Sequence, residues 1–213
     1  MNIALTPRKT PRQVRAQVTR NSILEAAAHI IAGGGLAAFN TNAVAERAGV
    51  SIGSLYQYFP NKDALMVALI ERSQREQVGR VQAAAHAMQD ADLDQTIRML
   101  VRAAQQHHRE NSLFASAIDH EEARLPIADM LDDYLAQGGE VLRTLLTQKL
   151  GPESGLDINC AVRTLPALVR AVGDAWANQN PPQLEIAEEE AVRAVAGYLQ
   201  AKTRPTILPS MQS

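Results

Sequence analysis

The sequence predicts an all-α protein with two helical parts. Long stretches rich in Ala, Leu, Glu, Arg and Gln, which are good helix formers, are interrupted by only 10 prolines and 12 glycines. Apolar residues make up 46% of the 213 residues, enough for a substantial core in one or two domains. Apolar residues also recur at helical spacing in most of the chain. We therefore expect a three-helix head at the N-terminal end and a larger helical domain after it.

The first helix is expected to run from about residue 15 to residue 32. Its core stripe is formed by Ile23, Ala27, Ile30 and Ile31. Three glycines at 33–35 should end this helix. Leu36 and Phe39 then close a small core from the loop that follows.

Two short helices joined by a tight turn are expected over residues 41–60. Thr41 is predicted to cap the first of them and Ser51 the second, because a hydroxyl there can accept from backbone N–H groups of the first turn. Gly49 lies between them, where the end of a helix requires a left-handed backbone conformation. The pattern fits a helix-turn-helix that reads the DNA major groove, but it also fits two packed helices without a partner.

The second of these helices has two different sides. Leu55 and Phe59, four residues apart, make one side apolar. The other side carries groups that can hydrogen-bond to bases or phosphates and includes no acid: Ser54, Tyr56, Gln57 and Tyr58. These residue types favour the DNA-reading interpretation.

A long fourth helix, capped by Asn61, should connect the head to the larger domain. Beyond it we expect five helices, at residues 93–110, 112–124, 127–149, 157–179 and 185–202. Prolines and glycines punctuate them. The last two carry wide apolar stripes, which predict that each helix buries one face.

Charge is distributed unevenly along the chain. Residues 1–62 carry seven Lys and Arg against two Glu, a net charge of +5, whereas the remainder carries 14 basic and 21 acidic residues, a net charge of −7. A positive N-terminal end is what phosphate contact requires. The sequence shows no apolar run long enough for a membrane span and no signal peptide, and its single cysteine suits a reducing compartment, so we expect a cytoplasmic protein.

The ordered string Ala-Gly-Val-Ser-x-Gly-Ser-Leu-Tyr-x-Tyr-Phe-x-Asn-Lys-Asp-x-Leu, at residues 48–65, closely resembles the DNA-binding domain of the tetracycline-repressor (TetR) family of bacterial transcription regulators. The resemblance begins upstream at Ile23-Leu-Glu-Ala-Ala and covers the first third of the chain. It implies a ligand-responsive repressor that binds a pseudo-palindromic double-stranded operator as a homodimer. It also implies that the last two helices of each subunit form a four-helix dimer interface.

The resemblance assigns DNA contacts by position. Phosphate contacts are expected from Thr41, Tyr56, Tyr58 and Lys62. Entry into the major groove is expected from Ile52, Gly53, Ser54 and Gln57. Gln57 is the main candidate base reader, since its amide can both donate to and accept from adenine. Asn42 is polar but uncharged, so its contact stays open, and Ile52 either meets a thymine methyl or packs.

The resemblance also implies a cavity for a small organic effector within residues 95–180. Apolar lining is expected from Phe114, Ile118, Leu131, Tyr134, Leu135 and Val169. Polar contacts or stacking are expected from Arg102, Gln106, Asp119 and Trp176. Ordinary core packing or surface exposure is the alternative for each of them.

The predicted domain division is a basic flexible arm at 1–16, a DNA-binding domain at 17–77, a ligand-binding and dimerisation domain at 78–204 and a tail at 205–213. The arm is either a solvated tail or a source of further contacts to phosphates or the minor groove through Arg8, Lys9, Arg12 and Arg15.

No catalytic or cofactor motif is present, so neither an enzyme nor a cofactor is expected. His107, His108 and the acidic run at 119–122 are interpreted as solvated helix faces rather than a metal site. Cys160 is predicted to be a buried structural thiol. Two alternatives to the ligand-released repressor stay open: a DNA-binding regulator without a small-molecule effector, and a helical binding or enzyme domain whose head only resembles a DNA reader.

Overall fold

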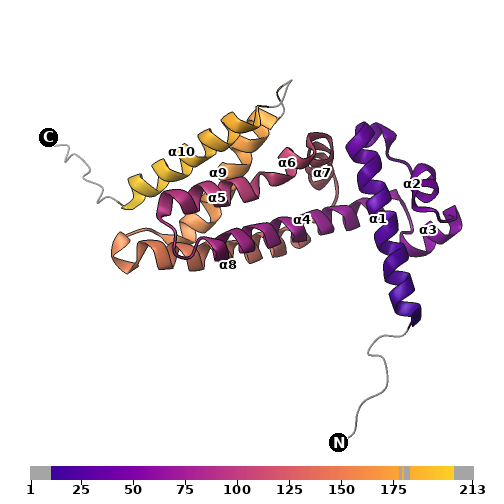
Figure 1. The fold of residues 1–213 in the computed structure, drawn as a ribbon, viewed down its shortest axis with the longest axis horizontal. Helices are drawn as coiled ribbons and strands as arrows, with labels where there is room; N and C mark the ends of the chain where they lie inside the picture. The colour runs from indigo at the N-terminus through magenta and orange to yellow at the C-terminus, as the bar shows by residue number, and fades with distance from the viewer. Residues whose placement is uncertain (1–10, 178, 180–182, 204–213) are drawn as a thin grey trace, which may run out of the picture. The chain divides into compact units, whose positions relative to one another are not determined.

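The computed structural model describes residues 11–177, 179 and 183–203 of the chain. Within these ranges every regular element is helical, as predicted (Figure 1). Arg8, Lys9 and the predicted tail at 205–213 lie outside the described residues. The chain divides into two compact units. Unit 1 comprises residues 1–70 and 117–125, and unit 2 comprises residues 71–116 and 126–213.

Unit 1 begins with α1 (Pro11–Ala38), which starts earlier than predicted. Proline suits the first turn of a helix, because the N–H group that it lacks would have no partner there. Of the three glycines expected to end this helix, only Gly35 leaves the helical conformation, with φ 62° and ψ −164°. Side chains other than glycine rarely adopt this backbone conformation, so the break falls at the third glycine.

The helix-turn-helix consists of α2 (Thr41–Ala48) and α3 (Ile52–Tyr58). The prediction that Thr41 caps α2 is wrong, because Thr41 is already helical. The cap is Asn40, whose side-chain oxygen accepts from the Ala43 N–H at 2.9 Å. Ser51 caps α3 as predicted and accepts from the Ser54 N–H at 3.0 Å.

The turn between α2 and α3 has the predicted left-handed glycine. Gly49 adopts φ 67° and ψ 29°, and its N–H group donates to the last turn of α2. The next N–H group, from Val50, returns to the Ala45 carbonyl at 3.0 Å. Together these bonds satisfy carbonyls at the end of α2 and set the direction in which α3 leaves the turn.

The core of unit 1 is formed by apolar side chains from every helix of the head. Its fully buried members include Ile23, Ala27, Ile31, Phe39, Val44, Leu55, Leu65 and Leu69. The second half of α7 (Ser112–Arg124) also belongs to this unit and buries Ala117 and Ile118. Of the predicted core stripe of α1, Ile23, Ala27 and Ile31 are buried as expected, whereas Ile30 is half-buried.

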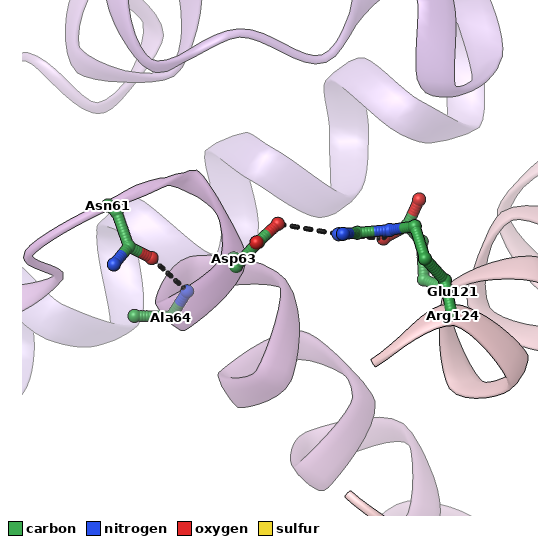
Figure 2. Close-up of polar contacts among 5 residues, drawn as sticks. All are labelled: Asn61, Asp63, Ala64, Glu121 and Arg124. Carbon is green, nitrogen blue, oxygen red and sulfur yellow. Dashed lines mark hydrogen bonds and ion pairs between the residues drawn. The ribbon is translucent and has the colours of Figure 1, made fainter. Parts of the chain in front are cut away.

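The helix α4 (Lys62–Ala87) begins in unit 1, where Asn61 caps it as predicted by accepting from the Ala64 N–H at 2.8 Å (Figure 2). Its residues from Glu71 onward belong to unit 2.

Unit 2 also contains α5 (Leu93–Ala104), α6 (Gln106–Glu110), α8 (Ala128–Leu150), the short 3-10 helix η1 (Pro152–Ser154), α9 (Ile158–Ala177) and α10 (Leu184–Thr203). The last helix packs against α9 and α5, and α9 also packs against α8. Their shared core contains Ile97, Val101, Leu146, Ala161, Leu165, Val192, Val195 and Leu199.

The single helix predicted at 93–110 is in fact two helices that meet at Gln105. Gln105 is buried, and its side-chain nitrogen donates to the Val169 carbonyl of α9 at 3.3 Å. A buried amide needs a hydrogen-bond partner, and this interaction lies at the point where the helix breaks.

Cys160 is exposed in the subunit, so the prediction of a buried thiol is wrong. The buried position is the next one along α9, Ala161, about 100° further around the helix. The hydroxyl of Tyr198 lies 3.5 Å from the sulfur. Hydrogen bonds from Tyr198 and Thr164 lower the pKa of the Cys160 thiol.

Candidate DNA-binding site

The outer face of α3 presents the residues that were predicted to enter a groove. Ile52, Gly53 and Gln57 are exposed, and Tyr56 keeps 47% of its surface accessible, whereas Leu55 on the opposite face is fully buried. Asn42 and Lys62 are exposed as well. Thr41, Ser54 and Tyr58 are half-buried. The helix is therefore anchored by an apolar side and offers a polar side to a partner.

Two of the candidate phosphate contacts lie against each other. The hydroxyls of Thr41, at the start of α2, and Tyr56, on α3, are 3.3 Å apart. Each hydroxyl has one proton to donate and lone pairs to accept with. One hydroxyl donates to the other, so the accepting hydroxyl keeps its own proton to donate to an external oxygen, next to the positive end of the α2 dipole.

Ser54 is less free than Gln57 to contact a base. Its hydroxyl lies 2.9 Å from that of Ser51, the α3 cap, so it takes part in the local capping arrangement. Gln57 lies three residues later on the exposed face. This difference supports Gln57 as the stronger candidate of the two for reading a base.

The ammonium group of Lys62 lies over the ring of Phe39, 5.0 Å from its centroid. Phe39 is buried, so this contact holds the lysine side chain against a fixed surface. The sequence indicated Lys62 but not its aromatic partner, because the two residues are 23 positions apart and no spacing rule connects them.

Within unit 1, an ionic cluster joins the first turn of α4 to the last turn of α7 (Figure 2). Arg124 Nη2 lies 2.5 Å from Asp63 Oδ1 and 2.6 Å from Glu121 Oε2. The hydrogen bond from Arg124 lowers the pKa of the Asp63 carboxyl, and the two carboxylates raise the pKa of Arg124. The sequence did not indicate this cluster, because Asp63 and Arg124 are 61 positions apart.

The ten candidate ligand-lining residues do not form one group within either unit. Ile118 and Asp119 belong to unit 1, and the other eight belong to unit 2. Leu135 is exposed at 59%, and Val169 is packed in the core of unit 2. Phe114, Leu131, Tyr134 and Trp176 are half-buried.

Two of the polar candidates in unit 2, and Tyr134 of the apolar set, have hydrogen-bond or ion-pair partners on the protein itself. Arg102 Nε lies 3.5 Å from Glu188, and Gln106 donates to Glu110 at 3.4 Å. Tyr134 accepts from Arg75 at 3.5 Å.

One cleft in unit 2 is lined by Gln105, Arg109, Gly173, Leu184 and Ala187, none of which was predicted as a ligand contact. It encloses no space large enough for a water molecule, so it is a depression in the surface and not a ligand cavity. Arg109 extends its guanidinium to Glu188 at 2.6 Å.

A capped helix-turn-helix with an exposed polar second helix, followed by a larger helical unit, defines a DNA-binding regulator. A family profile for bacterial regulatory proteins of the tetR family matches residues 23–69. A second profile, for the tetracyclin repressor-like C-terminal domain, matches residues 92–199, just over half of the chain. The chain belongs to the tetracycline-repressor family.

A part of the chain is also similar to named repressors. The chain is 47% identical over 53 residues to the HTH-type transcriptional repressor KstR of Mycolicibacterium smegmatis. The matched segment is 25% of this chain and 26% of that protein. The chain thus matches only about a quarter of the length of this curated relative. Family membership excludes the alternative in which the head merely resembles a DNA reader and the protein is an enzyme.

Solved structures share the fold over most of the chain. FadR from Bacillus subtilis, in complex with stearoyl-CoA, has 18% identity and a TM-score of 0.67, over 82% of this chain and 96% of that one. The multidrug binding protein EbrR, complexed with malachite green, has 24% identity and a TM-score of 0.59, over 84% and 96%. At these identities the similarity establishes the fold alone.

In the described part of the chain, no helix has the length and apolar character needed to span a membrane.

Proposed function

We propose that this regulator is a repressor that binds a pseudo-palindromic operator as a homodimer and leaves it when a small organic ligand binds. The observation that carries the DNA-binding part is the exposed polar face of α3 beside the Thr41–Tyr56 hydroxyl pair. In this arrangement Gln57 reads a base, while Thr41, Tyr56, Tyr58 and Lys62 hold the phosphates that fix its register.

Dimerisation is proposed to use α9 and α10. Both helices have wide apolar stripes, and family members present two recognition helices to two half-sites related by two-fold symmetry. Half-sites on one face of the duplex lie about one helical turn, ~34–36 Å, or a little more apart. A two-fold symmetric homodimer would therefore recognise an inverted repeat. We place the protein in the cytoplasm.

The effector is proposed to be a bulky and largely apolar organic molecule bound in unit 2. Two proteins that share the fold were solved with stearoyl-CoA and with malachite green, so this architecture accommodates such molecules. Among the apolar and aromatic candidates, Phe114, Leu131, Tyr134 and Trp176 are half-buried, neither exposed like Leu135 nor packed in the core like Val169. Release from DNA then requires that the ligand bind the non-DNA-binding conformation more tightly, by about 1–3 kcal/mol.

The test begins with a duplex recovered by in vitro selection from a random library with the full-length protein. Stearoyl-CoA and malachite green are then titrated separately, and two readouts are followed: binding of the duplex and fluorescence of Trp176, the single tryptophan. A ligand-released repressor shows a fluorescence change and loss of the duplex over the same concentration range. If the duplex is bound but no compound in a broad metabolite and drug screen releases it, the regulator without a small-molecule effector is the correct alternative.

A further inference from the structure

Arg20 of α1 lies against the end of the recognition helix. Its guanidinium carbon is 5.6 Å from the centroid of the Phe59 ring. Phe59 directly follows Tyr58, the last residue of α3, and only 3% of its surface is exposed. Because the ring is fixed in the core of the head, it holds the arginine in one place through a cation–π contact.

Lys62 also makes a cation–π contact with a buried aromatic ring. Its ammonium group lies over Phe39, and Lys62 is three residues after Phe59. The segment 59–61, which joins α3 to α4, is therefore in contact with Arg20 through Phe59 and is followed directly by Lys62. Tyr58 and Lys62, the residues on either side of the segment 59–61, are candidate phosphate contacts.

Within the described part of the head, neither Arg20 nor Lys62 forms an ion pair, although the Asp63 carboxylate next to Lys62 in the chain interacts with its charge. No carboxylate among the described residues makes an ion pair within 4.0 Å of either group, whereas Arg124 is paired with both Asp63 and Glu121. On α1 itself, the positions three and four residues from Arg20 hold no acid. Both cations are thus available to an external anion.

We propose that Arg20 is a further contact of the head to the DNA backbone, acting with Lys62 on phosphates near the carboxyl end of α3. A guanidinium that stacks on a ring keeps the N–H groups along its edge free, and these can donate in pairs to phosphate oxygens. This inference rests on the proposed binding of operator DNA. The alternative role for the Arg20–Phe59 contact is stabilisation of the head alone.

The test measures how binding depends on salt. Affinity for the selected duplex is determined from about 50 to 200 mM salt for the wild type and for Arg20→Gln, Lys62→Gln and Arg20→Lys. Arg98→Gln is the matched control, because it removes a surface arginine that pairs with Asp94 on α5, outside the head. Arg20→Met, whose side chain still covers Phe59, replaces Arg20→Gln if the glutamine variant does not fold. Melting temperatures are recorded for every variant.

Each phosphate contact contributes about 0.9 to the slope of log affinity against log salt. Arg20→Gln or Arg20→Met should therefore reduce the slope by ~0.9 per subunit, or ~1.8 for a dimer, as Lys62→Gln does. Arg20→Lys and Arg98→Gln should keep the wild-type slope. A wild-type slope in the Arg20→Gln and Arg20→Met variants, with or without a lower melting temperature, overturns the inference but leaves operator binding intact. Failure of the wild type to select any duplex overturns both.

Discussion

Arg124 of α7 donates to Asp63 of α4 across 2.5 Å, although the two residues are 61 positions apart in the chain. The interaction joins the segment 117–125 to the first turn of the helix that follows the recognition helix, within one compact unit (Figure 2). A part of the chain that is distant in sequence therefore belongs structurally to the DNA-binding head.

The Asp63–Arg124 pair should make the stability of unit 1 depend on pH. The pKa of Asp63 is lower in the folded protein than in an unfolded chain, so its contribution is present at neutral pH and is lost as pH falls through the folded pKa. Asp63→Asn should lower the melting temperature slightly at pH 7, and the difference from wild type should disappear in acid. Both side chains are exposed, so the effect is small. A difference that stays constant down to acid pH would contradict this account.

Replacement of the glycines at 49 and 53 should separate folding from binding. Gly49→Ala forces a Cβ into a left-handed backbone and should cost about 1–2 kcal/mol of stability, measured by urea unfolding. Gly53 is helical in an open environment, and the nearest atom to a Cβ added there would be Ser51 Oγ, at 3.9 Å. Gly53→Ala should therefore be neutral or stabilising by up to ~1 kcal/mol.

Gly53→Ala should nevertheless weaken operator binding, because its Cβ would lie on the exposed face of α3 that we propose approaches DNA. Unchanged affinity in this variant would show that the backbone at Gly53 does not come close to the duplex.

The two residues at the start of α2 should also differ in effect. Asn40→Ala removes the cap and should destabilise the protein by about 1 kcal/mol. Thr41→Ala leaves the cap intact and removes one hydroxyl of the Thr41–Tyr56 pair, so it should reduce DNA affinity with little change in unfolding. Parallel urea titrations and binding curves check both outcomes. A Thr41→Ala variant that loses more stability than Asn40→Ala would contradict the assignment of the cap.

The features that the sequence predicted are local. Gly49 and Ser51 act through neighbours within three or four residues, and the apolar spacing of the head marks its buried face. The cap at Asn40 was missed by one residue, because Asn and Thr are both good caps and the sequence does not show which of two neighbours turns helical first.

The features that were missed depend on contacts between distant segments. The break at Gln105 is accompanied by a hydrogen bond to Val169, and the Arg124–Asp63 pair joins two helices, so neither leaves a periodic signal. The aromatic partners of Arg20 and Lys62 are hidden for the same reason. The prediction that Cys160 is buried was wrong because adjacent positions on α9 face different sides of the helix: Cys160 is exposed, and Ala161 is buried.

The central claim is that the exposed face of α3 reads base sequence, and Gln57→Ala tests it most directly. Affinities of wild type, Gln57→Ala and Lys62→Ala are measured on the selected operator and on a set of its single-base variants at fixed salt. Loss of a base contact should remove about 1–3 kcal/mol of discrimination at one position of each half-site in Gln57→Ala, whereas Lys62→Ala should weaken all duplexes by a similar factor. If Gln57→Ala leaves the relative affinities among operator variants unchanged, the assignment of base reading to this residue is wrong.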